Sequence, residues 1–156
     1  MSSVNTDKDG LERFADSMTR ILPVFMKSFA QRRTDELYKG KITMQQFVAL
    51  TYLNYHAGKY GATMGGLAKN LYVTMPAVTG VVNRLIRSGY CIRLSDVRDR
   101  RIVRVTITPK GARLVRKMYR QRKEMIMRIF AKINRHDRGQ YLRILKNVAQ
   151  ILNEEE

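Results

Sequence analysis

The sequence predicts a mainly α-helical chain with one small β-hairpin, an α+β arrangement. Apolar residues recur at spacings of three and four over most of the chain, which is the period of an amphipathic helix. Only two short runs, at residues 91–94 and 102–107, are rich in strand-forming residues, and a polar turn separates them. The 156 residues are enough for one domain with a core, or for a compact module with long flanking helices.

The N-terminal segment predicts a long amphipathic helix. Residues 1 to about 10 are expected to be frayed, and the apolar pattern begins at Leu11. Pro23 lies inside this pattern and is expected to kink or split the helix, because proline removes a backbone hydrogen bond and clashes with the preceding turn. Gly40 closes the segment.

The next helix is predicted from a capping box. Thr43 is the N-cap and Gln46 the third helical residue, and Ile42 and Phe47 fit a hydrophobic staple around them. This helix is expected to end near His56.

Two short helices follow. Thr63 caps the first, which runs to about Leu71, and Thr74 caps the second, where Pro76 is tolerated in the first turn. Gly89 then ends the second helix, in the position typical of a left-handed residue.

The rest of the chain predicts a hairpin and two more helices. Strands at Cys91–Leu94 and Ile102–Ile107 flank the polar turn, and Thr108-Pro109 starts a long helix to about Asn134. A last helix starts at or near Asp137.

Two short helices, a hairpin and a new helix, in this order, form a winged helix-turn-helix. This module places one helix in the major groove of DNA and the hairpin beside it. We therefore expect a DNA-binding lobe over residues 41–111. An N-terminal dimerisation helix region would cover residues 1–40, and a connecting helix with a C-terminal dimerisation helix would cover residues 112–156.

The charge balance agrees with a nucleic-acid partner. The net charge is +17, and between Arg84 and Lys123 the only acids are Asp96 and Asp99. A patch so strongly of one sign repels itself in a folded protein, so a polyanion such as double-stranded DNA is the expected partner.

Other features narrow the setting. A single cysteine excludes an intrachain disulfide framework, the polar N-terminus is unlike a secretory signal, and no apolar run reaches membrane-spanning length. These features predict a cytoplasmic protein with no membrane partner. Cys91 is expected to be a buried, inert thiol. His56 and His136 lack neighbouring ligands at metal-binding spacing, and no catalytic motif is present, so no metal, cofactor or enzymatic activity is expected.

The helix that starts after Thr74 is the predicted reading element. Val78, Val82 and Leu85 share the core-facing side. Small residues early in the outward face would let the helix approach base edges, and polar residues further on suit adenine, guanine or phosphate. The alternative is an ordinary solvated face. The outward residues are Pro76, Ala77, Thr79, Gly80, Asn83, Arg84 and Arg87.

The hairpin turn is the second predicted contact. Arg98, Arg100 and Arg101 lie within four residues, and arginine at a hairpin tip suits the narrow, electronegative minor groove. Asp99 is expected to pair with Arg101 and orient its guanidinium. The alternative is a solvated turn. The basic first half of the following long helix could equally contact phosphates or face solvent.

The two ends of the chain predict an interface. Each has a long apolar face that the small lobe does not need, and such a surface marks a contact. The faces could pack on each other within one chain, but a homodimer is the better expectation, because most DNA readers of this kind are two-fold dimers. The faces comprise Leu11, Phe14, Met18, Ile21 and Phe25, and Tyr141, Leu145, Val148 and Leu152.

Four segments together resemble the MarR family of transcriptional regulators: LAKNL, TMPAVTGVVNRLIRSGY, DVRDRR and TITPKG. The resemblance implies a homodimer that binds a pseudopalindromic operator, usually as a repressor. It also implies a small lipophilic or phenolic effector. Asp99 and Arg101 match the family's Asp-x-Arg element, in which the arginine enters the minor groove and the aspartate holds it. Departures are Pro23 and Gly66, the latter at a position that is often acidic in the family.

The sequence therefore predicts a dimeric DNA-binding transcriptional regulator. The alternative from another class is an architectural protein that binds DNA with little regard to sequence. The preference for an operator over random duplex separates the two.

Overall fold

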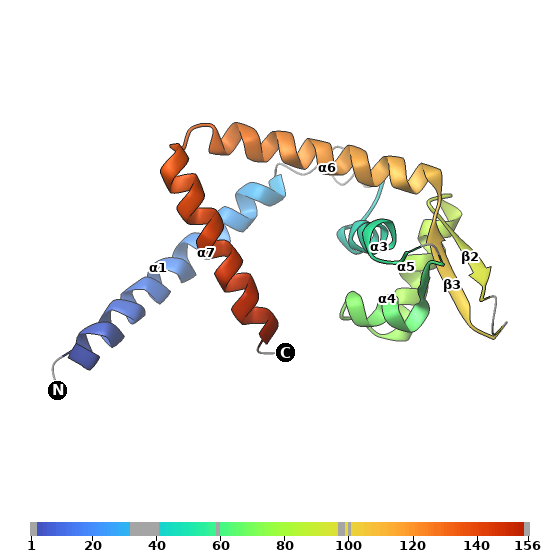
Figure 1. Cartoon of the computed structure of the whole chain (residues 1–156), viewed down its shortest axis with the longest axis horizontal. Coiled ribbons are helices and arrows are strands. Elements are labelled where there is room, and N and C mark those ends of the chain that lie inside the picture. Colours follow the sequence, from blue (N-terminus) through green and yellow to red (C-terminus); the bar gives the residue numbers. More distant parts are fainter. Residues whose placement is uncertain (1–2, 32–40, 59, 97–98, 100, 155–156) are drawn as a thin grey trace.

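The computed structural model describes residues 3–31, 41–58, 60–96, 99 and 101–154. Figure 1 shows a lobe at one end of the molecule and α1 and α7 at the other, with α6 running along one edge to connect them. The elements in chain order are α1 (Ser3–Gln31), α3 (Met44–Tyr55), β1 (Ala62–Thr63), α4 (Met64–Asn70), α5 (Met75–Arg87), β2 (Cys91–Ser95), β3 (Val103–Ile107), α6 (Pro109–Phe130) and α7 (Arg135–Glu154).

The lobe has one hydrophobic core, to which α3, α4, α5, the sheet and the first half of α6 all contribute. The prediction that Val78, Val82 and Leu85 face the core is confirmed, and Val81 is buried beside them. The largest fully buried side chains are Leu50, Leu67, Leu85, Met118, Val78, Val81, Val82, Val105 and Val115.

Threonines occupy the N-cap positions of α3, α4 and α5, as predicted, and two of the three make the capping hydrogen bond. The capping box at α3 is complete: Thr43 Oγ1 accepts from the Gln46 amide at 3.2 Å, and Gln46 Oε1 accepts from the Thr43 amide at 2.8 Å. Thr63 Oγ1 accepts from the Gly66 amide at 3.1 Å, so α4 is capped without an acidic side chain at that position. Thr74 holds the N-cap position of α5, but its side chain makes no cap hydrogen bond.

The sheet has a third strand that the sequence analysis missed. The strand order is β1-β3-β2, and both pairings are antiparallel. β1 is two residues long and pairs Ala62 with Val105, so it is too short to leave an alternating pattern in the sequence. Gly61 precedes it with a φ of +73°, and a Cβ there would lie 2.4 Å from the Val105 carbonyl oxygen. Only glycine fits that backbone conformation and that close approach.

One expectation for the N-terminal helix is wrong, and a second is wrong in part. α1 begins at Ser3 rather than near Leu11, so residues 3–10 are helical. The helix also runs through Pro23 without a break, so the expected split is wrong, while the alternative of a kink stays a prediction. The proline lies on a solvent-exposed stretch, where water can satisfy the carbonyl that loses its intrahelical partner.

The C-terminal helices follow the prediction with small shifts. α6 ends at Phe130, and a turn leads to α7, whose start is held by Asn134: its Oδ1 accepts from the Asp137 amide at 2.9 Å. The rings of Phe130 and Tyr141 lie 5.3 Å apart across this corner. Among the described residues, no helix combines the length and the apolar character needed to span a membrane.

Candidate nucleic-acid interface

The outward face of α5 is accessible. Pro76, Ala77, Asn83, Arg84 and Arg87 are exposed. The other two residues of the predicted face, Thr79 and Gly80, are half-buried. The chain therefore presents the residues predicted for reading DNA on the side of α5 opposite its buried valines.

Two of these residues interact with their own helix. The Thr79 hydroxyl donates to the Met75 carbonyl at 2.8 Å. Its proton is therefore engaged, and a ligand can contact only the methyl group or the lone pairs of the hydroxyl oxygen. A Cβ at Gly80 would lie 3.7 Å from Nη2 of Arg84, so the arginine side chain extends back along α5 as far as Gly80.

Asn83 is coupled to the hairpin. Arg93 in β2 donates from Nη2 to Asn83 Oδ1 at 2.8 Å. This contact joins α5 to the strand beside it, and it orients the Asn83 amide so that its NH₂ group points away from the arginine. The sequence alone does not indicate Arg93 as a site residue, because a contact between residues on different elements leaves no local pattern.

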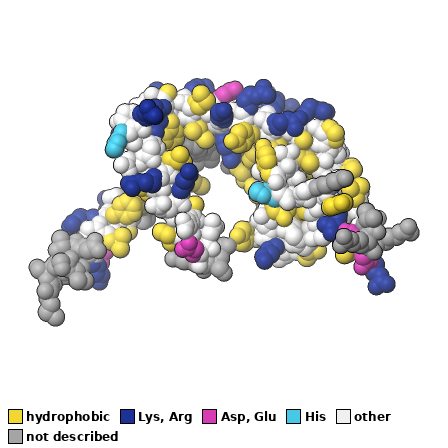
Figure 2. Space-filling model, in the orientation of Figure 1, with side chains coloured by type: hydrophobic (Ala, Val, Ile, Leu, Met, Phe, Trp, Pro, Cys, Tyr) yellow, Lys and Arg dark blue, Asp and Glu magenta, His cyan; other side chains and the backbone are white. Residues whose placement is uncertain are grey.

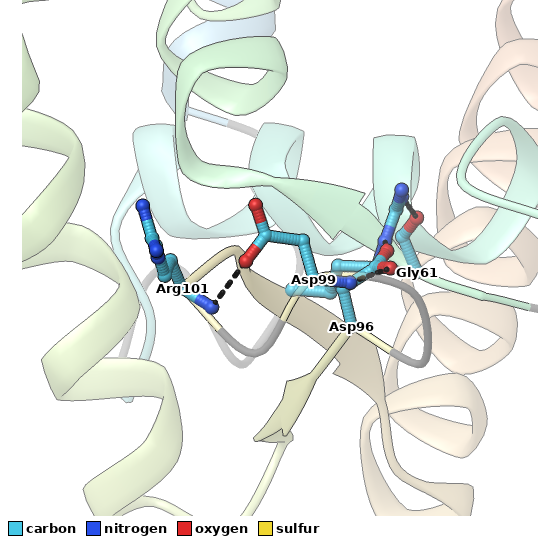
Figure 3. Close-up of polar contacts among 5 residues, drawn as sticks. Gly61, Asp96, Asp99 and Arg101 are labelled. Atoms are coloured by element: carbon cyan, nitrogen blue, oxygen red, sulfur yellow. Dashed lines mark hydrogen bonds and ion pairs between the residues drawn. The ribbon is translucent and has the colours of Figure 1, made fainter.

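Asp99 holds the wing turn in a different way from the prediction. Its Oδ1 accepts from the backbone amide of Arg101 at 2.9 Å, and the Arg101 side chain extends away from this carboxylate (Figure 3). The expectation that Asp99 orients the guanidinium is therefore wrong. A short aspartate side chain reaches the amide two residues on more readily than the end of a long side chain. The Arg101 guanidinium is left exposed at the turn.

Asp96 organises the base of the same turn. Its carboxylate accepts from Nε of Arg104 and from the Asp99 amide, the latter at 3.3 Å. Arg104 also reaches the Gly61 carbonyl at 3.5 Å, so one arginine connects the wing to the start of β1 (Figure 3). Backbone hydrogen bonds close the turn at 2.9 Å, from Asp96 to Ile102 and from Ile102 to Asp99. The sequence shows Asp96 as an acid beside a basic turn, but it does not indicate that Arg104 is the partner of Asp96.

Arg98 and Arg100, the other two predicted wing residues, lie outside the described residues.

The base of the hairpin is joined to α6. Lys110 donates from Nζ to the Ser88 carbonyl at 2.8 Å and lies 5.0 Å from the centre of the Tyr90 ring. Gly111 packs so closely that a Cβ would lie 2.3 Å from the Tyr90 carbonyl oxygen. The C-terminus of α5 and the start of α6 therefore hold each other in place.

Cys91 begins β2 on the buried side of the sheet. Burial raises the pKa of its thiol from 9.0 to about 12, because desolvation disfavours the thiolate. The prediction of a buried thiol is confirmed, and little nucleophilic thiolate exists at neutral pH.

Comparisons with known proteins agree with this architecture. Residues 42–103 match the model of the MarR family. A Mycobacterium bovis protein called uncharacterized HTH-type transcriptional regulator Mb0904 is 32% identical over 111 residues, which are 71% of this chain and 73% of that protein. The chain belongs to the MarR family. The MarR resemblance inferred from the four segments is thus confirmed, together with the winged-helix fold.

Further matches cover different lengths. A Bacillus subtilis protein, uncharacterized HTH-type transcriptional regulator YsmB, is 30% identical, and the match spans 66% of its length. A MarR family protein from Bacillus stearothermophilus superposes with a TM-score of 0.80 at 24% identity, covering 91% of this chain and 97% of the other. A mutant of Staphylococcus aureus MepR bound to an oligodeoxyribonucleotide gives 0.62 at 25% identity, covering 91% and 98%.

These matches show a MarR-family transcriptional regulator with a DNA-binding fold. The curated relatives carry the names of regulators rather than of enzymes. The roles of individual residues in α5 and the wing, and the domain limits at residues 40 and 111, stay predictions.

Proposed function

We propose that this MarR-family regulator is a homodimer that represses transcription by binding a pseudopalindromic operator through α5 and the wing. The observation that carries the proposal is the exposed polar face of α5 beside a wing turn held by Asp96 and Asp99. An exposed helix and a preorganised hairpin tip are the two parts that a winged helix-turn-helix uses to contact adjacent grooves.

In this proposal α5 lies in the major groove. Pro76, Ala77 and Gly80 let its first turns approach the base edges, and Thr79 offers its methyl group to a thymine. Asn83, Arg84 and Arg87 follow, as readers of base edges or as phosphate contacts.

The wing lies against the adjacent minor groove. Arg101 enters the groove, where the negative potential is concentrated, and Asp99 holds the backbone from which it projects. Arg98 and Arg100 belong to the same basic tip and contact neighbouring phosphates in this proposal.

The apolar faces of α1 and α7 form the dimer interface. Among the described residues, none in α7 is buried within the single chain. Leu11, Phe14, Ile21, Leu145 and Leu152 are at least half exposed. Met18, Phe25, Tyr141 and Val148 complete the two faces. Burying them against a second copy would place the two α5 helices about one DNA turn apart, roughly 34–36 Å. A small lipophilic or phenolic effector that releases the DNA completes the proposal and derives from the family resemblance.

Two measurements test the proposal. Light scattering should give twice the 18.2 kDa chain mass. Selection from random duplex DNA should recover an inverted repeat with half-site centres about ten base pairs apart, bound about a thousandfold tighter than random duplex. Equal affinity for selected and random duplexes would favour the architectural alternative, which the net charge of +17 also fits. A stable monomer with full operator affinity would refute the dimer.

A single substitution tests the wing. Arg101→Ala should weaken operator binding by about 1–3 kcal/mol, the range of one specific contact, without unfolding the protein. Arg143→Ala in α7 removes the same charge far along the chain and is the matched control. Unchanged affinity in Arg101→Ala, with an intact circular dichroism spectrum, would show that the wing arginine does not contact DNA.

A further inference from the structure

A row of basic residues lies along the first half of α6. Arg113, Arg116, Arg120 and Lys123 are all exposed, and we call them the α6 basic row. Figure 2 shows Lys and Arg side chains gathered along the edge of the molecule formed by α6. This row has no part in the proposed contacts of α5 and the wing.

Helix geometry places the row opposite the core. At about 100° per residue, the members of the row cluster around one direction, about half a turn from the buried Val115 and Met118. Arg122 shows the contrast, because it lies on the core side with its guanidinium 5.3 Å from the centre of the Phe47 ring. The row is therefore a separate surface and is not a set of side chains that cover the core.

No member of the row forms an ion pair in the described part of the chain, and the one acid of α6, Glu124, lies at the far end of the row. The ion pair found among the described residues is that of Arg104 with Asp96, in the wing. Like charges three or four residues apart on a helix destabilise it by about 0.2–0.5 kcal/mol per pair. Arg113 with Arg116, Arg116 with Arg120, and Arg120 with Lys123 are three such pairs. A polyanion bound along the row would remove this repulsion.

The row and the outward face of α5 point in different directions. Val78, Val82 and Leu85 of α5 lie in the same core cluster as Val115 and Met118 of α6, so the core lies between the two helices. A duplex lying on α5 and the wing would therefore have the lobe between it and the row. An occupant of the row is a second molecule or a second segment of DNA.

We infer that the α6 basic row binds the phosphate backbone of a second DNA duplex, so that the regulator bridges two DNA segments. Three of the four residues are arginines, whose planar guanidinium binds phosphate oxygens in pairs. The row extends over eleven residues, or about 15 Å from first to last, a length that faces several successive phosphates of one strand. A narrow, evenly spaced line of charge fits a nucleic-acid backbone better than the irregular surface of an acidic protein.

The test measures capture of a second duplex. One duplex is immobilised and saturated with the full-length protein, and a fluorescent second duplex is added. This design rests on the proposed binding of the first duplex by α5 and the wing, and that binding is measured separately with single-duplex titrations. The variant Arg113→Gln/Arg116→Gln/Arg120→Gln removes three charges with good helix formers. The matched control is Arg135→Gln/Arg143→Gln/Lys146→Gln, which removes three exposed charges from α7.

We expect the parent and the α7 control to capture the second duplex. The α6 variant should lose at least about tenfold in capture, because it forgoes three phosphate contacts, while it still binds the first duplex. Replacing the same three arginines by lysine should keep capture, since lysine retains the charge. This variant distinguishes a loss of capture caused by lost charge from one caused by a disturbed α6 helix.

Capture by the α6 variant equal to that of the parent would overturn the inference, because bridging would then run through the lobes of the dimer. An equal loss in the α7 control would also overturn it, because total charge alone would then explain capture. If polyglutamate blocked capture where an equal charge of unlabelled duplex did not, the row would be a surface for an acidic protein. If the α6 variant lost binding of the first duplex while Arg101→Ala kept it, the first duplex would lie on α6. That result would count against the proposed function and not against the bridging inference.

Discussion

The contact between Asp99 and the Arg101 amide predicts that operator affinity depends on Asp99 as a hydrogen-bond acceptor and not on an attraction between its charge and the Arg101 guanidinium. Asp99→Asn keeps an acceptor oxygen at the position that receives the amide at 2.9 Å, whereas Asp99→Ala removes it. Both variants lose the same negative charge, so any gain in attraction to phosphates is common to both. The difference between them isolates the hydrogen bond.

The magnitude follows from the exposure of the contact. A hydrogen bond of this kind contributes about 0.5–1.5 kcal/mol net, and the turn is open to water, so the lower half of the range applies. If the turn must be formed for Arg101 to reach the groove, Asp99→Ala should bind the operator roughly 2- to 5-fold more weakly than Asp99→Asn.

Fluorescence anisotropy with a labelled operator, at one fixed salt concentration, measures this difference. Salt must be held constant because phosphate contacts make affinity strongly salt-dependent. If Asp99→Asn is as weak as Asp99→Ala, the carboxylate acts through its charge on the guanidinium, and the role that the geometry gives it is refuted.

The remaining predictions concern the lobe and its support. Arg93→Ala and Asn83→Ala should be non-additive in operator affinity by about 0.5–1 kcal/mol in a double-mutant cycle, because one hydrogen bond joins them; strict additivity would argue against coupling. Gly111→Ala should destabilise the fold by about 1–3 kcal/mol in denaturant titration, since its Cβ would meet a backbone oxygen. Gly139→Ala, in open space within α7, should stabilise the fold by about 0.5–1 kcal/mol. If both substitutions changed the free energy of unfolding in the same direction, the packing argument would be contradicted. Iodoacetamide at pH 8 should label Cys91 at least about tenfold more slowly in the folded protein than in urea, because burial raises the thiol pKa to about 12; equal rates would show an accessible thiolate.

Local chemistry made much of the lobe predictable. The caps at Thr43 and Thr63 depend on residues three positions away, and the structure shows the predicted hydrogen bonds. The buried face of α5 follows from the helical period, so Val78, Val82 and Leu85 could be assigned without coordinates. Gly89 ends α5 with a φ of +72°, as a glycine at that position predicts.

Two errors concern local alternatives between which a residue pattern does not distinguish. The break expected at Pro23 ignored how little an exposed helix loses when one carbonyl turns to water. The expected pairing of Asp99 with the Arg101 guanidinium assumed attraction between charges, whereas the nearer backbone amide is the actual partner.

The sequence by itself determined the order of the elements, the helix caps, the core positions and the concentration of basic residues, because each depends on neighbours within a few positions. The tertiary structure decided which distant residues meet. β1 pairs with β3, Arg104 joins Asp96 to a carbonyl 43 residues earlier in the chain, and Arg93 bonds Asn83 across two elements. It also decided that α5 and the α6 basic row lie on opposite sides of one core. These contacts join residues that are far apart in the sequence, so the spacing of neighbouring residues does not predict them.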